Sequence, residues 1–284
     1  MKKFNIILKK YKLINIMLKG WKKITHSDVE KILIYNSNLN TVEYFNSIIY
    51  QIYSKMIYKE INNKLVIAKA SAIMGTYSII KFYGDNTLND SLLENKFTLR
   101  GHDIKGKNDK FGDEYIYDTN ECIKLEGSKF YPFRKALSKY KNRVKIENGF
   151  HDDIYEILKL YPNHQSKLFK FIIEYPYLVT VTRVYIDNQI LGFSIVENIN
   201  AHNGVIIQEL FNKDMGVRYA SYIVHYCNCL NNKSKILNAG GSRNKNIKFA
   251  KNKLRPCKLL KIKRLVSNNK LTREEWFYLR DNMV

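Results

Sequence analysis

Proline and cysteine are scarce in this 284-residue sequence, and each scarcity excludes a class of protein. Its 4 prolines and 13 glycines are too few for long flexible linkers. Its 4 cysteines exclude a disulfide scaffold and favour reduced, buried thiols in a cytosolic protein. Cys227 and Cys229 lie two residues apart on an expected helix, so their thiols point to different faces. The six histidines lack ligand spacing, and we expect no metal site.

Long apolar runs are also lacking. The N-terminal segments 4–8 and 13–18 are apolar, but lysines interrupt them and neither reaches the roughly 18 residues that span a bilayer. No small-residue cleavage site follows them. We therefore expect no transmembrane segment, no signal peptide and a cytoplasmic location. Two alternatives stay open for residues 1–20: a basic amphipathic helix on an anionic membrane surface, or an element completing the first domain.

Acidic residues are few, and none occurs between Asp214 and Glu274. The chain has 48 Lys and Arg against 26 Asp and Glu, a net charge of +22. Such a protein is attracted to nucleic acid, to an anionic membrane surface or to a phosphate-rich cofactor. Charge does not choose among these partners, and a generally basic surface without a specific partner is the simplest alternative.

The hydrophobic content of 45% is typical of a globular protein, and the apolar pattern predicts a similar series of elements in each half. The first half is predicted to begin with a helix from the capping box of Ser27 and Glu30 and a helix over 42–56, followed by strands at 58–61, 64–70 and 76–83. An irregular connection over 84–112 is predicted to lead to a strand at 114–118, a basic helix over 129–143 and a strand at 144–147. The second half is predicted to begin with helices over 151–160 and 164–174, followed by a hairpin of 178–186 and 190–198 around Asp187 and Asn188 and a strand at 205–211. A helix from Gly216, a strand near Ile236, a basic helix ending near Pro256, a strand at 258–266 and a helix from Thr272 are predicted to follow. These series predict an α/β (α+β) fold of two domains in tandem, at 1–147 and 148–284, each a mixed, mostly antiparallel sheet flanked by helices.

Two glycine turns in the second half each precede an expected helix, a position where backbone N–H groups hold anions. The first turn contains Gly216, Val217 and Arg218. The second is the run Asn238, Ala239, Gly240, Gly241 and Ser242. A plain structural turn is the alternative for each.

A three-stranded meander followed by a glycine turn and a helix resembles the core order of the GNAT acyltransferases. A local pattern resembles one family more closely, the phosphatidylglycerol lysyltransferase C-terminal-domain-like proteins. Its matching positions are Leu125, Gly127, Lys129 and Arg134. Phe133 departs from that family's usual lysine. The second glycine turn is more similar to the FemAB-like aminoacyltransferases that build peptidoglycan bridges.

The resemblance covers most of the chain and implies tandem GNAT-like domains that transfer an acyl or aminoacyl group to an amine or hydroxyl. The donor would be acyl-CoA or an aminoacyl-tRNA, with no metal. Glu209, on the strand before the first turn, is the candidate general base, and Tyr219 and Ser221 are candidate proton donors to the leaving group. Gln208 faces the other side of that strand.

The resemblance also assigns binding residues. The first turn would cradle the donor phosphates, with Arg218 adding charge. The second turn would contact the donor through Asn238, Gly240, Gly241 and Ser242. Lys251 would pair with a donor phosphate or a substrate carboxylate. Lys129 and Arg134 would line a cleft between the domains on the acceptor side.

A cytosolic tandem-GNAT transferase is therefore our leading hypothesis, and it requires splayed strands beside Gly216. The first alternative is a basic protein that binds DNA or RNA, which includes a phage GNAT-type enzyme that modifies DNA. The second is a peripheral membrane enzyme that aminoacylates a lipid.

Overall fold

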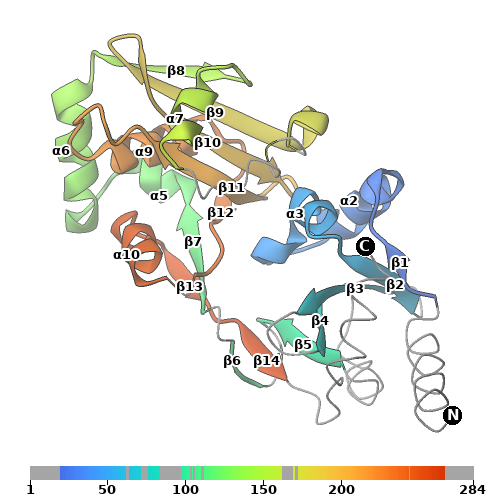
Figure 1. Ribbon diagram of the computed structural model, residues 1–284. Coiled ribbons are helices and arrows are strands. Elements are labelled where there is room, and N and C mark those ends of the chain that lie inside the picture. The colour runs from blue at the N-terminus through green and yellow to red at the C-terminus, as the bar shows by residue number, and fades with distance from the viewer. Residues whose placement is uncertain are drawn as a thin grey trace, which may run out of the picture. The chain divides into compact units, whose positions relative to one another are not determined.

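The chain forms two compact units in the computed structural model shown in Figure 1. The structure describes residues 20–61, 64–71, 76–83, 97–102, 104, 106–109, 112–161, 169, 172–242 and 244–265. Several predicted features lie outside them: the N-terminal amphipathic segment, the turn at Asn62 and Asn63, much of the 84–112 connection, most of the 164–174 helix and the helix from Thr272. No helix among the described residues is long and apolar enough to cross a membrane.

The first unit comprises Met1–Tyr35, Gln51–Asp109 and Lys261–Val284, and is built on a seven-stranded sheet. In sheet order the strands are β1 (Lys22–Lys23), β2 (Ile57–Ile61), β3 (Lys64–Ser71), β4 (Thr76–Tyr83), β5 (Phe97–Gly101), β14 (Lys263–Leu265) and β6 (Lys107–Asn108). The meander β2–β3–β4 is antiparallel, whereas β5 runs parallel to β4.

The 3-10 helix η1 (His26–Asp28) and α2 (Val29–Ser37) lie between β1 and β2 in the chain. The capping box lies two residues before the predicted one, because the Asp28 carboxylate accepts from the backbone N–H and the hydroxyl of Thr25, both at 2.9 Å. The predicted 42–56 helix is divided. Ser47, with ψ of 116°, separates η2 (Tyr44–Asn46) from α3 (Ile48–Tyr53).

The second unit comprises Asn36–Tyr50 and Lys110–Leu260, and is built on a second seven-stranded sheet. In sheet order the strands are β13 (Lys258–Leu260), β7 (Glu114–Asp118), β12 (Ile236–Asn238), β11 (Asn203–Phe211), β10 (Gln189–Asn198), β9 (Val179–Ile186) and β8 (Val144–Asn148). The predicted β9–β10 hairpin is confirmed. Asp187 and Asn188 both have positive φ, at 50° and 63°, as a two-residue hairpin turn requires.

Helices cover both faces of the second sheet. They are α5 (Thr119–Lys124), η4 (Ser128–Phe130), α6 (Tyr131–Tyr140), α7 (Ile154–Lys159), η5 (Pro176–Leu178), α9 (Ala220–Asn231) and α10 (Lys245–Lys253). On one face α9 packs against β10 and β11 with α5 and α6 beside it (Figure 1), and Phe133 and Ile223 are among the fully buried side chains there. Each such side chain contributes about 2 kcal/mol by leaving water. On the other face Phe193 of β10 contacts Phe169 edge to face, and Phe169 also contacts Tyr155 of α7.

The first sheet takes β14 from the second half of the sequence, and the second sheet takes β7 and β8 from the first half. β14 lies between β5 and β6, and β7 lies between β12 and β13. The domain boundary therefore differs from the predicted one between residues 147 and 148. Residues 110–147 belong to the second unit because β7 is hydrogen-bonded to strands of that unit along both edges. The predicted single strand over 258–266 is two strands, β13 and β14, in different sheets. The predicted fold class, mixed sheets flanked by helices, is confirmed.

Candidate functional site

The second sheet opens where β11 parts from β12. The two strands pair in parallel only from Asn203 with Ile236 to Val205 with Asn238. Immediately beyond, Val196 pairs with Ile206 and Ile195 with Gln208, which leaves Ile207 as an extra, bulged residue of β11. A bulge bends and twists its strand, so β11 continues to Phe211 away from the line of β12. β11 thus runs on beyond its last pair with β12, toward the turn that contains Gly216.

A cavity of about 700 Å³ occupies this opening within the second unit. Its walls are mostly apolar and aromatic, with a few polar groups, as in small-molecule sites. Residues 206–211 of β11, the start of α9 and the inner side of α10 form much of the wall. The other lining residues are Tyr44, Tyr50, Tyr117, Tyr161, Ala239, Gly241 and Leu254.

Glu209 is the carboxylate in the cavity wall, with 14% of its side chain exposed. Its oxygens lie 3.1 and 3.2 Å from Nδ1 of His225, and Oε2 also accepts from the Asn228 amide at 3.1 Å. Both partners come from buried positions of α9. Two partners on a rigid helix therefore orient the carboxylate, while one side of it reaches the cavity.

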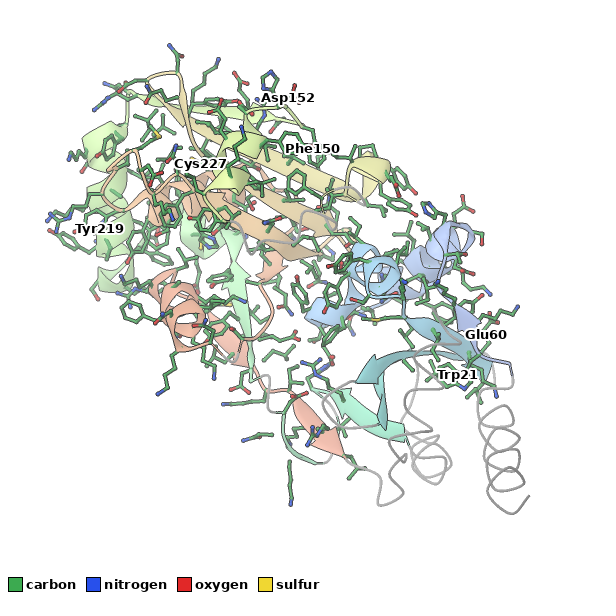
Figure 2. The ribbon with its side chains drawn as sticks, in the orientation of Figure 1. Trp21, Glu60, Phe150, Asp152, Tyr219 and Cys227 are labelled. Carbon is green, nitrogen blue, oxygen red and sulfur yellow. The ribbon has the colours of Figure 1, made fainter. Side chains whose placement is uncertain are left out.

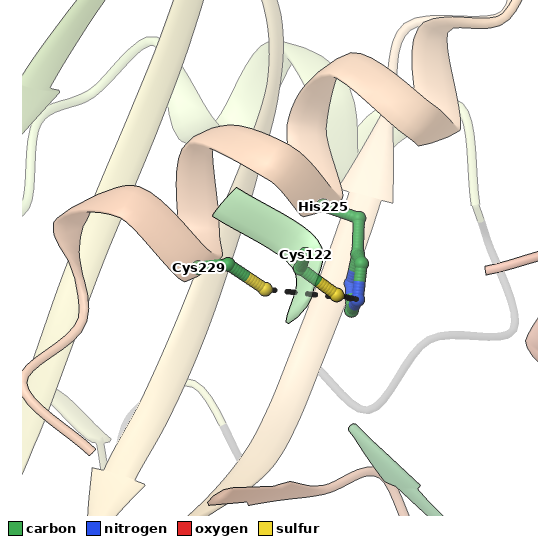
Figure 3. Close-up of side chains that lie close together, drawn as sticks. All are labelled: Cys122, His225 and Cys229. Atoms are coloured by element: carbon green, nitrogen blue, oxygen red, sulfur yellow. Dashed lines mark hydrogen bonds between the residues drawn. The ribbon is translucent and has the colours of Figure 1, made fainter. Parts of the chain in front are cut away.

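His225 continues this contact into the interior. Its Nε2 lies 3.9 Å from Sγ of Cys122 and 3.8 Å from Sγ of Cys229 (Figure 3). Burial alone would lower the pKa of His225, but the adjacent Glu209 carboxylate and Cys122 thiol outweigh it and raise that pKa above its usual value of 6.5. Sequence reasoning missed this cluster. The spacing of His225 and Cys229, four residues apart on one helix face, was the available signal; Cys122 is distant in the sequence.

Lys251, on α10, also lines the cavity. Its Nζ donates to the carbonyl oxygens of Ala239, Gly240 (3.0 Å) and Gly241 (3.5 Å). Burial lowers the pKa of the amine to about 8, although Glu114 and Glu209 act in the opposite direction. Lys251 thus joins α10 to the second glycine turn and places a cation in the wall.

The second glycine turn is held mainly by contacts within the protein. Asn238 is buried, donates to the Val42 carbonyl at 2.8 Å and to Glu114 at 2.7 Å, and accepts from the Gly240 N–H at 2.7 Å. Gly240 has φ of 66°, and a Cβ there would lie 2.6 Å from the Tyr44 ring. Ser242 Oγ accepts from the N–H of Asn244, the cap of α10. Of the four residues predicted to bind the donor here, only Gly241 lines the cavity.

The first glycine turn leads directly into α9. Gly216 has φ of 62°, and Tyr219, labelled in Figure 2, has φ of 69° as the N-cap. Of the first N–H groups of α9, that of Ala220 donates to the Val217 carbonyl at 3.3 Å and that of Tyr222 to the Tyr219 carbonyl at 2.9 Å. Arg218 is exposed and lies over the Tyr219 ring at 4.8 Å. The residues of this turn, Gly216 to Tyr219, do not line the cavity. Ser221, in the first turn of α9, does.

Lys129 and Arg134 belong to the second unit rather than to a first domain, and neither lines the cavity. Lys129 is exposed and forms an ion pair with Glu121 at 2.5 Å. Arg134 donates to the carbonyl of Leu125 and, at 2.8 Å, to that of Gly127. Leu125 has φ of 54°, so Arg134 stabilises the left-handed end of α5. The structure thus gives both residues contacts that hold the α5–α6 connection.

The meander, the bulged β11, the splayed β12 and the intervening α9 make this second unit GNAT-like. No protein-family model and no curated protein sequence matches the chain. Solved structures do match. A conserved protein of unknown function from Bacteroides thetaiotaomicron superposes with a TM-score of 0.68 at 15% identity, over 87% of this chain and 99% of its own.

Two further matches bear on the family. The C-terminal domain of an Agrobacterium fabrum protein described as a lysylphosphatidylglycerol synthetase has a TM-score of 0.58 at 13% identity, over 91% of this chain and 96% of its own. L-PGS of Bacillus licheniformis has a TM-score of 0.58 at 12% identity, over 88% and 96%. The chain therefore has the fold of the lysyltransferase C-terminal domains that its sequence resembles.

Proposed function

We propose that the second unit is a GNAT-type transferase that moves an acyl or aminoacyl group from a carrier to an amine or hydroxyl acceptor. The observation that carries this proposal is the cavity beside the unpaired continuation of β11 past β12, with Glu209 oriented in its wall. The carrier would be acyl-CoA or an aminoacyl-tRNA. One protein of the same fold is described as a lysylphosphatidylglycerol synthetase, which supports an aminoacyl group.

The first glycine turn would bind the carrier phosphates. The positive end of the α9 dipole and the exposed Arg218 guanidinium would supply the attraction, because the N–H groups of Ala220 and Tyr222 already donate to the carbonyls of Val217 and Tyr219. Ser221, the second residue of α9, lies in the cavity wall. The carrier would thus stay at the helix terminus while the acyl group enters the cavity.

The reaction needs a proton acceptor and a proton donor. The acceptor nitrogen or oxygen attacks the donor carbonyl carbon and gives its proton to Glu209. The carbon–sulfur or carbon–oxygen bond to the carrier then breaks, and the leaving atom takes a proton from Ser221, with Tyr219 as the alternative donor. The proton held by Glu209 returns through solvent to that hydroxyl, so each turnover moves one proton from the acceptor to the leaving group. Lys251 would pair with a negative charge of the donor or acceptor.

A donor screen with Glu209→Gln tests the proposal. The purified chain is incubated with a panel of acyl-CoAs and aminoacyl-tRNAs and with amine and hydroxyl acceptors, and product is followed by mass spectrometry. Removing the proton acceptor should reduce turnover roughly 10²- to 10⁴-fold. Glu121→Gln removes an exposed carboxylate of the same unit and should leave turnover unchanged.

Binding separates the donor site from the chemistry. Gly216→Trp should weaken binding of the active donor, because it blocks the turn and places a bulky side chain at positive φ. The proposal fails if Glu209→Gln turns over normally. It also fails if Gly216→Trp binds acyl-CoA and aminoacyl-tRNA as the wild type does.

A further inference from the structure

We propose that Cys122, His225 and Cys229 form a binding site for one thiophilic d10 cation, Zn²⁺ or Cu⁺, in the interior of the second unit. One ligand atom of each residue, the two Sγ atoms and the histidine Nε2, lies within 4.8 Å of the other two. Figure 3 shows the three side chains converging from two helices. The inference rests on this geometry and does not depend on the proposed transferase function.

The distances fit a single ion. Zinc binds thiolate sulfur at about 2.3 Å and imidazole nitrogen at about 2.0 Å, so two ligand atoms at a tetrahedral angle lie roughly 3.5–3.8 Å apart. The observed sulfur–nitrogen distances are 3.8 and 3.9 Å. An ion placed among the three atoms would therefore reach all of them with shifts of a few tenths of an ångström.

The scaffold that holds the ligands is rigid. His225 and Cys229 are four residues apart on α9, so they share one helix face. Cys122 comes from α5, which packs against α9. All three are buried, with at most 1% of each residue exposed. Cys227, between the two α9 ligands, points to a different face and is not part of the group.

A second contact orients the histidine for a metal. Nδ1 of His225 lies 3.1 Å from Oε2 of Glu209, and Asn228 holds the same oxygen at 3.1 Å. A carboxylate that accepts from one imidazole nitrogen fixes the tautomer and directs the lone pair of the other nitrogen toward a metal. Here that second nitrogen faces the two thiols. The carboxylate–histidine pair of a carboxylate–histidine–metal arrangement is thus in place.

Charge favours the same ligand class. Two buried thiolates without a cation would be costly; Zn²⁺ neutralises both charges and Cu⁺ neutralises one of them. Thiolate and imidazole ligands suit Zn²⁺ and Cu⁺ better than oxygen-preferring ions such as Mg²⁺ or Ca²⁺. Three protein ligands satisfy three-coordinate Cu⁺, whereas Zn²⁺ would take water as the fourth. The bound ion would tie α5 to α9 and hold His225 against the cavity carboxylate.

Metal binding by the full chain tests this inference. The protein is purified under reducing conditions without metal-affinity resin, and its metal content is measured by inductively coupled plasma mass spectrometry. Chelator-treated chain is then titrated anaerobically with Co²⁺, which reports thiolate ligation by charge-transfer absorption, and separately with Zn²⁺ and with Cu⁺ against competing chelators. We expect one ion per chain, and the competition identifies the preferred cation.

The variants use a matched control. Cys122→Ser and Cys229→Ser should each weaken metal binding at least tenfold and reduce the cobalt charge-transfer band. Cys227→Ser replaces an equally buried thiol of the same helix and should keep one ion and the full band.

The wild-type titration alone can overturn the inference, so a variant that fails to fold does not protect it. Absence of a stoichiometric ion together with absence of the cobalt band would refute the site. The inference would also fail if Cys122 and Cys229 form a disulfide in the metal-free chain and the reduced chain still binds no ion. Equal loss of metal in Cys227→Ser would refute it as well.

Discussion

The buried carboxyl of Glu197 makes the second unit less stable as pH rises. Glu197 lies on β10 with 1% of the residue exposed. It accepts from the Ser47 hydroxyl at 2.5 Å and from the N–H groups of Ile48 and Ile49 at 2.6 and 3.3 Å, at the start of α3. Burial raises its pKa from 4.5 to about 7, although the three hydrogen bonds act in the opposite direction. The folded state therefore binds this proton more tightly than the unfolded state.

The sign and size follow from that difference. Between pH 4.5 and about 7 the unfolded chain loses the proton first, so the free energy of unfolding falls as pH rises through this range. The two pKa values give a loss of about 2.5 kcal/mol between about pH 5 and about pH 8. Glu197→Gln removes the titration and keeps an oxygen that accepts from the α3 backbone. Relative to wild type, the variant should therefore gain about 2.5 kcal/mol over this range.

Hydrogen–deuterium exchange of the β10 amides at both pH values measures this gain locally, after correction for intrinsic exchange. Subtracting wild type from variant cancels the other titrating groups. Glu126→Gln, an exposed site, controls for the loss of one charge. A variant-minus-wild-type difference that is constant with pH, or that favours the wild type at high pH, would refute the reasoning.

Three further predictions concern packing and the cavity. Gly192→Ala should lower the free energy of unfolding by about 3 kcal/mol in urea titrations, because its Cβ would lie 2.4 Å from the Leu210 carbonyl oxygen, which the sheet holds in place. A loss under about 0.5 kcal/mol would contradict that packing. Gly240→Ala should cost about 1–3 kcal/mol, since it combines positive φ with a 2.6 Å approach to the Tyr44 ring, and the pairing Gly240→Ala with Tyr44→Ala should recover part of that loss. Lys251→Met should abolish the pH dependence of binding an anionic donor. Wild-type affinity, measured calorimetrically, should fall as pH rises through about 8, because the Lys251 amine loses its proton there. Equal pH profiles of wild type and variant would exclude the pairing of Lys251 with the donor.

Local sequence signals predicted much of the second unit. The β-branched run and the Asp187–Asn188 turn specify the β9–β10 hairpin through contacts between neighbours in sequence. The order of strand, glycine turn and helix likewise placed Glu209 and Ser221 near one another, because both flank one short connection. Their roles in catalysis stay predictions. Element boundaries were less accurate where a tertiary contact intervenes, as at Ser47, whose hydroxyl binds Glu197 from a strand far along the chain.

By itself, therefore, the sequence determined the mixed α/β class, the meander and the two glycine turns, since these follow from alternation, helical periodicity and turn chemistry over a few residues. Only the tertiary structure decided which strands share a sheet. β13 and β14 are nearly adjacent in sequence but pair in different sheets, and β7 enters the second sheet from the first half. The same long-range pairing brings Cys122, on the helix after β7, to His225 and Cys229. Such contacts depend on hydrogen-bonding edges and packed faces separated by more than a hundred residues, which no local pattern encodes.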